Sequence, residues 1–218
     1  MNILKILRYG FQYIRLLLLY SNHPIKSIFI SVWLRSNGDI LFSFKGSNFT
    51  TKINVSRLYQ LLTLLDRGWQ IKEISAEYVT LQKNVCLKCR LLKGLDLGHI
   101  NEIYEKKAYG IEPREYVVDA GASNGDSAIY FAVNGASKVL ALEPDPESYA
   151  LAEENVKVNK LEEKVILLQA ALSSTEGEAN FLIPVSLPNA SSLKPTEHLS
   201  KAIDFGHAKQ MQVKTVAL

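Results

Sequence analysis

The sequence predicts a fold of the α/β class: a Rossmann-like parallel sheet in the second half of the chain, preceded by an α+β region. Buried strand, helix, strand, helix and strand alternate over residues 116–172, which is typical of a parallel sheet. A Gly-x-x-x-Gly turn, Gly121 to Gly125, joins the first strand to its helix. An acidic residue, Glu143, ends the second strand about 20 residues later, the spacing found in nucleotide-binding sheets.

The first half, residues 1–112, is expected to form the α+β region. Apolar residues recur at three- and four-residue steps over 3–20, and Ser56 precedes a second such series. This pattern predicts helices at 3–20 and 57–67, with Ser56 as a cap of the second. An Asn37-Gly38 turn between β-branched and aromatic runs predicts a hairpin. The remaining expected elements of this half are hairpin strands 27–34 and 40–44, short strands near 78–81 and 85–91, and a helix over 100–108.

The second half, residues 113–218, begins at Pro113 and is expected to form the sheet. Its strands are short apolar runs, and its helices follow turn residues such as Pro144 and Pro146. The expected elements are strands from 116, over 138–142, 165–172, 179–184 and 211–217, helices after Gly125 and over 147–159, and a loop over 184–195.

The amino-acid composition limits the classes of protein to which the chain can belong. With 47% hydrophobic and 22% charged residues the chain is globular, and a net charge of +3 does not by itself require a nucleic-acid partner. Cys86 and Cys89 are too few for a disulfide framework and lack a second ligand pair for zinc, so we expect ordinary thiols, no metal and a cytoplasmic location.

The N-terminal segment is strongly basic: residues 1–65 contain eight Lys or Arg and one acid, Asp39. The helix expected over 3–20 is therefore amphipathic and cationic. A weak contact with a membrane surface is one interpretation, and packing on the rest of the protein with a solvated basic face is the other.

The residues around the glycine turn discriminate between cofactors. A Walker loop requires Gly-Lys-Ser/Thr, but Asp126 follows Gly125. A dinucleotide site prefers a further glycine at the position of Ser123. The carboxylates of Asp119 and Asp126 would also repel the pyrophosphate of a dinucleotide. An NAD-dependent reductase is therefore a weak alternative. The same carboxylates suit S-adenosylmethionine, which carries a sulfonium and an ammonium group and no phosphate.

Each part of the expected site has a distinct role. Asp119 faces the methionine end of the cofactor, the backbone of the turn passes close to it, Glu143 accepts hydrogen bonds from the ribose hydroxyls, and the strand end at Ala170 lies beside the adenine. No residue is singled out as a catalytic base. The full expected cofactor-binding set is Asp119, Gly121, Ala122, Ser123, Asn124, Gly125, Asp126, Glu143, Pro144 and Ala170.

Several motifs together resemble the FkbM family of class I methyltransferases. The segments that carry the resemblance are 118–126, Val139 to Pro144, Glu154-Asn155 with Asn159, and 170–173, so that it covers roughly residues 100–218. The lead-in Glu102-Ile103-Tyr104 with Tyr109 is also similar, and Asn189-Ala190-Ser191-Ser192 resembles a polar loop that the family places near the acceptor. The resemblance implies S-adenosylmethionine-dependent O-methylation of a hydroxyl on a sugar or small metabolite. No nucleic-acid partner is expected, because the basic N-terminal segment lacks the interleaved aromatic and basic residues typical of RNA-binding modules.

The chain departs from that family after its last expected strand. The family continues into an Asp-x-Glu-Gly-like strand and the rest of the sheet, and no such segment follows Val213 to Leu218. The expected sheet is therefore incomplete, as in a fragment, a truncated paralogue, or a protein whose missing half comes from another chain. The alternative to an enzyme is a non-catalytic module that binds S-adenosylmethionine or a partner, with a peripheral membrane location as one variant of it.

Overall fold

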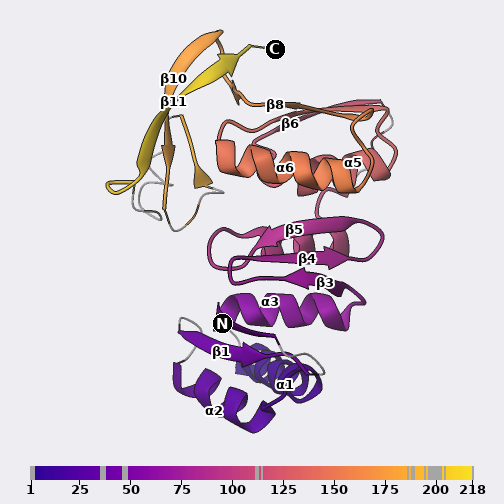
Figure 1. Cartoon of the computed structure of the whole chain (residues 1–218), viewed down its shortest axis with the longest axis vertical. Helices are drawn as coiled ribbons and strands as arrows, with labels where there is room; N and C mark the ends of the chain where they lie inside the picture. Colours follow the sequence, from indigo (N-terminus) through magenta and orange to yellow (C-terminus); the bar gives the residue numbers. More distant parts are fainter. Residues whose placement is uncertain are drawn as a thin grey trace. The chain divides into compact units, whose positions relative to one another are not determined.

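The structure, a computed structural model, consists of two compact units (Figure 1). The first comprises residues 1–84 and 90–92, and the second comprises residues 85–89 and 93–218. The structure describes residues 3–34, 38–45, 49–110, 113, 115–185, 187, 190–193, 195, 203 and 205–217. The boundary at residue 113 inferred from sequence stays a prediction.

Two helices open the first unit. Helix α1 spans Ile3–Tyr20, as predicted, and α2 spans Pro24–Leu34, where a strand was expected. The strand prediction was wrong because a proline at the helix start and side-chain contacts with neighbouring segments outweighed the strand preference of the β-branched residues. Pro24 stands at the first helical position, where its fixed φ favours a helix. Contacts then hold the helix, since Ser31 Oγ lies 3.1 Å from the Tyr13 hydroxyl and Ser27 Oγ lies 2.9 Å from Ser21 Oγ.

The strand expected at 40–44 exists but has a different partner. Strand β1 (Asp39–Ser43) pairs antiparallel with β2 (Thr50–Asn54). The turn residues Ser36 and Asn37, on which the hairpin prediction rested, lie outside the described residues. The prediction failed because an Asn-Gly turn defines a hairpin only where both flanking segments are strands.

The rest of this unit follows a capped helix. Helix α3 (Val55–Asp66) begins one residue before the expected cap, because the side chain of Asn54, not that of Ser56, accepts a hydrogen bond from the first turn (2.9 Å to Ser56 N). Strands β3 (Gln70–Ile74) and β4 (Tyr78–Gln82) then form an antiparallel pair.

The second unit is built around three parallel strands. Strands β6 (Tyr116–Ala120), β7 (Lys138–Leu142) and β8 (Val165–Leu168) pair in the order β6-β7-β8, with Asp119 opposite Ala141 and Ala141 opposite Leu167. The α/β class predicted from sequence is thereby confirmed. Before the sheet, β5 (Cys86–Arg90) contributes its first four residues to this unit, and α4 (Asp96–Ile100) continues into a π-helical turn, η1 (Asn101–Glu105).

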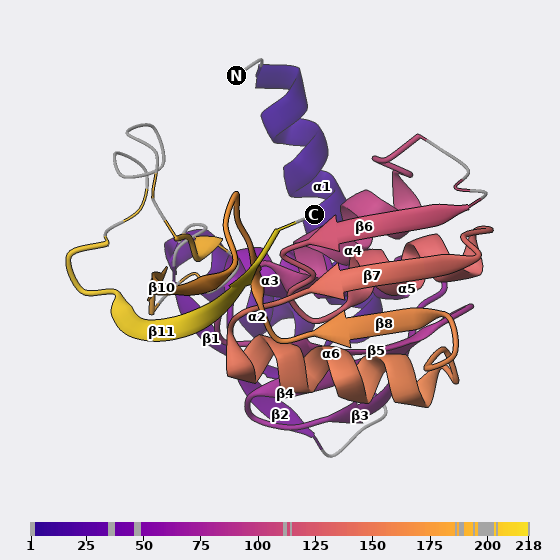
Figure 2. The same cartoon turned by 90° about the horizontal axis from the view of Figure 1, so that it is seen from above.

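Helices cover one face of this sheet. Helix α5 (Asp126–Val133) and α6 (Pro146–Val158) lie along the same side (Figures 1 and 2) and bury Val139 and Ala141 completely. On the opposite face Tyr116 (80% exposed), Val118 and Ile166 are open to solvent.

A second, smaller sheet follows. The run expected as one strand over 165–172 divides into β8 and β9 (Ala171–Leu172), and β9 pairs in parallel with β11 (Lys209–Val216). Strand β10 (Gly177–Ile183) pairs antiparallel with β11, and Phe181, Ile183 and Val213 form a small core with Ala171. The β8–β9 bend therefore links the two sheets within the unit. Among the helices that the structure describes, none has the length and hydropathy to cross a bilayer.

Candidate cofactor site

The glycine turn between β6 and α5 requires backbone conformations that favour glycine. Gly121 has φ +83°, Gly125 has φ +80°, and Ser123 between them has φ +48°. Gly125 N donates to Ala122 O (2.7 Å), which closes the turn. A Cβ on Gly121 would meet nothing within 4 Å, so the side of the turn at Gly121 is open for a ligand to approach.

Glu143 holds the turn from the end of β7. The residue is only 6% exposed, and its carboxylate accepts two backbone hydrogen bonds, from Ser123 N (2.7 Å) and Asp145 N (2.9 Å). A buried carboxylate loses its hydration, and these charge-assisted hydrogen bonds replace it and fix the position of the side chain. Each oxygen of a carboxylate can accept more than one hydrogen bond.

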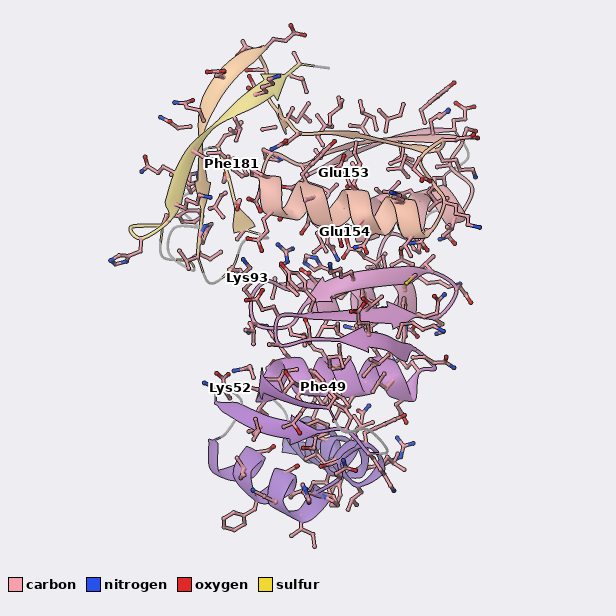
Figure 3. The ribbon with its side chains drawn as sticks, viewed as in Figure 1. Phe49, Lys52, Lys93, Glu153, Glu154 and Phe181 are labelled. Carbon is pink, nitrogen blue, oxygen red and sulfur yellow. The ribbon has the colours of Figure 1, made fainter. Side chains whose placement is uncertain are left out.

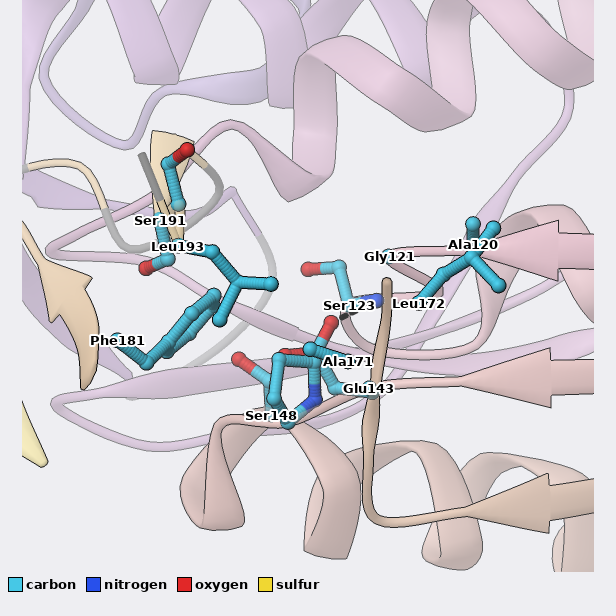
Figure 4. A pocket seen from close by; sticks show the side chains of 12 residues that line it. Ala120, Gly121, Ser123, Glu143, Ser148, Ala171, Leu172, Phe181, Ser191 and Leu193 are labelled. Atoms are coloured by element: carbon cyan, nitrogen blue, oxygen red, sulfur yellow. Dashed lines mark hydrogen bonds between the residues drawn. The ribbon is translucent and has the colours of Figure 1, made fainter. Parts of the chain in front are cut away.

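Glu143 lies at a cavity of about 430 Å³ at the carboxyl ends of β6 and β7 (Figure 4). In open parallel sheets this is the position where ligands bind, and the volume falls in the usual range for small-molecule sites. The lining residues are Ala120, Gly121, Ser123, Glu143, Pro144, Ser148, Ala171, Leu172, Phe181, Ser191, Ser192 and Leu193. Gly121, Ser123, Glu143 and Pro144 were predicted for the site, and the structure brings all four to the cavity.

The other predicted residues lie around the turn without lining the cavity. Ala122 and Asn124 are completely buried, Gly125 packs against Ala152, and Ala170 is 4% exposed. Ala171, the next residue, lines the cavity in its place, because the strand bends between β8 and β9. The roles expected for these residues stay predictions.

The two carboxylates that flank the turn have different surroundings. Asp119 is partly buried and accepts a hydrogen bond from Ser127 Oγ (2.6 Å), and burial raises its pKa above the usual value, although the Ser127 bond acts in the opposite direction. Asp126 is buried, accepts from Ser127 N (2.7 Å), and lies 3.8 Å from His99 Nδ1. Neither carboxylate lines the cavity, but Asp119 directly precedes Ala120, the last residue of β6, which does line it.

Aromatic side chains surround this acidic end of the turn. The Tyr104 hydroxyl donates to Asp126 O (2.8 Å), and the ring of Tyr109 lies 4.7 Å from that of Phe131 and 5.9 Å from that of Tyr130. Burial raises the pKa of Tyr104 well above its usual range, and the nearby Asp126 adds to this effect. Both tyrosines are therefore neutral donors or apolar surfaces at neutral pH.

Apart from two serines of the polar loop, the predicted set left out six cavity residues: Ala120, Ser148, Ala171, Leu172, Phe181 and Leu193. Phe181 and Leu193 come from the region of the small second sheet, so no strand–turn–helix pattern could connect them with the glycine turn. Ser191 and Ser192, from the polar loop noted by resemblance, do line the cavity (Figure 4). Asn189 of that loop lies outside the described residues.

Comparison with known proteins gives a different family from the one expected. Residues 99–193 match the model of the TRM5/TYW2 methyltransferase domain. The chain is 39% identical to a ribosomal protein L11 methyltransferase of Carboxydothermus hydrogenoformans over 59 residues, which are 27% of this chain and 19% of the relative. It is 33% identical to the methyltransferase sdnD of Sordaria araneosa over 100 residues, 44% of this chain and 39% of the relative. The chain thus spans well under half the length of these curated relatives.

The chain also resembles solved structures of TYW2 and Trm5. TYW2 of M. jannaschii in complex with AdoMet is 28% identical, with a TM-score of 0.33 over 45% of this chain and 46% of that one. The complex of aTrm5 with tRNALeu is 19% identical, with a TM-score of 0.40 over 69% of this chain and 53% of that one.

These findings correct two expectations and confirm a third. The resemblance to the FkbM family is wrong, because the methyltransferase model that matches is that of TRM5/TYW2. The expectation of a small-molecule hydroxyl acceptor without nucleic acid is contradicted by the same match. The cofactor expectation is confirmed: residues 99–193 match a domain type that uses S-adenosylmethionine.

Proposed function

We propose that this protein is an S-adenosylmethionine-dependent methyltransferase whose acceptor is an RNA, in the first instance a tRNA. The observation that carries the proposal is the cavity beside Glu143 and the glycine turn, which falls within the segment that matches the TRM5/TYW2 methyltransferase domain. The relatives that carry these names include a tRNA m1G37 methyltransferase and an enzyme solved with tRNALeu.

The residues of the cavity fit the cofactor part by part. Glu143, held by two backbone N–H groups, accepts hydrogen bonds from vicinal ribose hydroxyls. The apolar residues Leu172, Phe181 and Leu193 provide a surface for a flat base. The cofactor supplies a methyl group on a sulfonium that is ready for displacement. The chain's contribution is to bind and orient it, with Asp119 placing negative charge near its cationic end.

The distribution of charge supports an RNA acceptor. The first compact unit contains 12 Lys or Arg and four Asp or Glu, a net charge of +8, whereas the second contains 13 and 18, a net charge of −5. A basic unit attracts the phosphate backbone without reading sequence. The cytoplasm, which low cysteine use favours, also supplies such acceptors.

A protein acceptor is the second candidate. It is favoured by the curated relatives, two of which are ribosomal protein L11 methyltransferases, at 39% and 33% identity over the matched residues.

One experiment separates the two. The protein is incubated with methyl-labelled S-adenosylmethionine and a cell extract that contains RNA and ribosomal proteins, and the labelled product is treated with ribonuclease or with protease. Release of label by ribonuclease alone supports an RNA acceptor, and release by protease alone supports the second candidate. Absence of cofactor binding by calorimetry would overturn both.

A further inference from the structure

Two asparagines, Asn155 in α6 and Asn159 at its C-cap, act on strand β5 as a neighbouring strand would. Asn159 accepts from Cys86 N (2.8 Å) and donates to Cys86 O (2.6 Å). One helical turn earlier, Asn155 accepts from Lys88 N (2.7 Å) and donates to Lys88 O (3.0 Å). Each side-chain amide thus satisfies both backbone groups of one strand residue, which a helix surface alone cannot do.

The second N–H of each amide is used differently. In Asn159 it donates to the carbonyl of Asn155, in the helix itself (2.7 Å). In Asn155 it donates to the carbonyl of Asn124, at the centre of the glycine turn (2.8 Å). Asn155 is completely buried, and both of its donors and its acceptor oxygen are engaged.

The turn needs this bond because the side-chain contacts of the same residue are weak. The Asn124 side chain is completely buried, yet its Oδ1 has no hydrogen-bond partner among the described residues. Its Nδ2 lies 3.4 Å from Lys88 O, beyond the usual range for such a bond, and 3.9 Å from Cys89 Sγ, which is a weak acceptor. Asn124 lies next to Ser123, whose positive φ is costly for a residue with a side chain.

We propose that Asn155 is a positioning residue for the glycine turn: by holding the Asn124 carbonyl it keeps Ser123 and Gly121 in the shape that receives the cofactor. The turn is then fixed from two sides, by Glu143 at Ser123 N and by Asn155 at Asn124 O. This inference rests on the proposed function for its cofactor, although the conformation of the turn can be tested without one.

The chain provides a matched pair of variants. Asn155→Ala, in α6, and Asn159→Ala, at its C-cap, each remove three side-chain hydrogen bonds, two of which hold β5. Only Asn155→Ala also releases the turn. Asn155→Asp, which keeps the size and the bond from Lys88 N but loses both donors, serves where the alanine variant is too unstable to study.

Two measurements on folded protein test the proposal. In unliganded protein, hydrogen exchange at the amides of residues 123–126 should accelerate in Asn155→Ala or Asn155→Asp and not in Asn159→Ala. By calorimetry with S-adenosylmethionine, the Asn155 variants should raise Kd by about tenfold, as expected for one buried hydrogen bond, while Asn159→Ala stays within about twofold.

The outcomes separate this inference from the proposed function. Equal effects of the two alanine variants on exchange and on Kd would show that Asn155 is merely structural and overturn the proposal. If the wild type binds no S-adenosylmethionine, the proposed function fails, and the exchange data alone then decide whether Asn155 positions the turn.

Discussion

At the residue scale, Glu143 combines two tasks that a single carboxylate rarely performs while buried. It stabilises the turn by accepting two backbone hydrogen bonds, and it faces a cavity in which ribose hydroxyls can reach it. The negative charge makes both kinds of bond stronger than a neutral oxygen would.

Glu143→Gln tests this double role. The variant keeps the shape but replaces one acceptor oxygen by an amide donor that would face a backbone N–H. We expect Kd for S-adenosylmethionine to rise about 10- to 100-fold, the range for losing hydrogen bonds to a charged group. Calorimetry on folded protein measures it, with the exposed Glu162→Gln as the control. Unchanged affinity in Glu143→Gln would contradict the role of this residue.

The charge of Glu143 stabilises the turn, whereas the charge of Asp119 lowers the stability of the unliganded fold. Burial raises the pKa of Asp119, so the folded protein holds this proton more tightly than the unfolded chain does. The resulting stabilisation is complete below the pKa of the unfolded chain and is lost as pH rises through the folded pKa. At neutral pH the charged form is therefore a cost to the unliganded fold.

Asp119→Asn should remove that cost. In urea titrations the variant should be more stable than the wild type at pH 7, and its advantage should shrink as pH falls through the folded pKa of Asp119. Its affinity for the cationic cofactor should fall about tenfold, through loss of an attractive charge. A variant less stable than wild type at pH 7 would show that the Ser127 hydrogen bond outweighs burial.

At the scale of elements, the glycine turn was predictable because its signal is local. Strand, turn and helix are consecutive, and positive φ at Gly121 and Gly125 requires the residue type that the sequence shows. Helix α2 was missed because Ile28, Phe29 and Ile30 favour a strand by propensity, which Pro24 at the helix start and tertiary contacts together outweigh. The cavity wall from Phe181 and Leu193 was missed for the same reason, since non-local pairing of β9 with β11 brings it there.

The two glycines of the turn allow a matched comparison. Both have positive φ, but a Cβ on Gly125 would lie 3.2 Å from Ala152 Cβ, whereas one on Gly121 meets nothing within 4 Å. We expect Gly121→Ala to cost roughly 1–2 kcal/mol of stability through its backbone conformation alone. Gly125→Ala should cost more, because the contact with α6 is added. Thermal unfolding of both variants gives the difference, and equal losses would contradict the close packing of α6 on the turn.

At the scale of the whole molecule, the division of charge between the two units is the feature that the sequence totals concealed. A net charge of +3 looked too small to indicate a nucleic-acid partner, because the +8 of the first unit and the −5 of the second nearly cancel. An average over the chain cannot show a field that acts locally, within about one Debye length of roughly 8 Å at physiological salt. The side chains of Lys52 and of Arg15 illustrate the exposed basic groups of the first unit (72% and 58% exposed; Lys52 is labelled in Figure 3).

This division predicts where RNA affinity resides. Reversing two exposed lysines of the first unit, in the double variant Lys72→Glu/Lys83→Glu, should weaken binding of a tRNA transcript. It should also reduce the slope of log K against log salt by about 0.7 to 0.9 for each phosphate that the protein no longer neutralises. The double variant Lys157→Glu/Lys160→Glu changes the net charge equally but lies in the second unit, and it should leave the slope unchanged. Fluorescence anisotropy between 50 and about 200 mM salt measures both. Equal losses in the two variants would mean that the first unit has no special part in RNA binding, and wild-type affinity without salt dependence would contradict a phosphate-binding role.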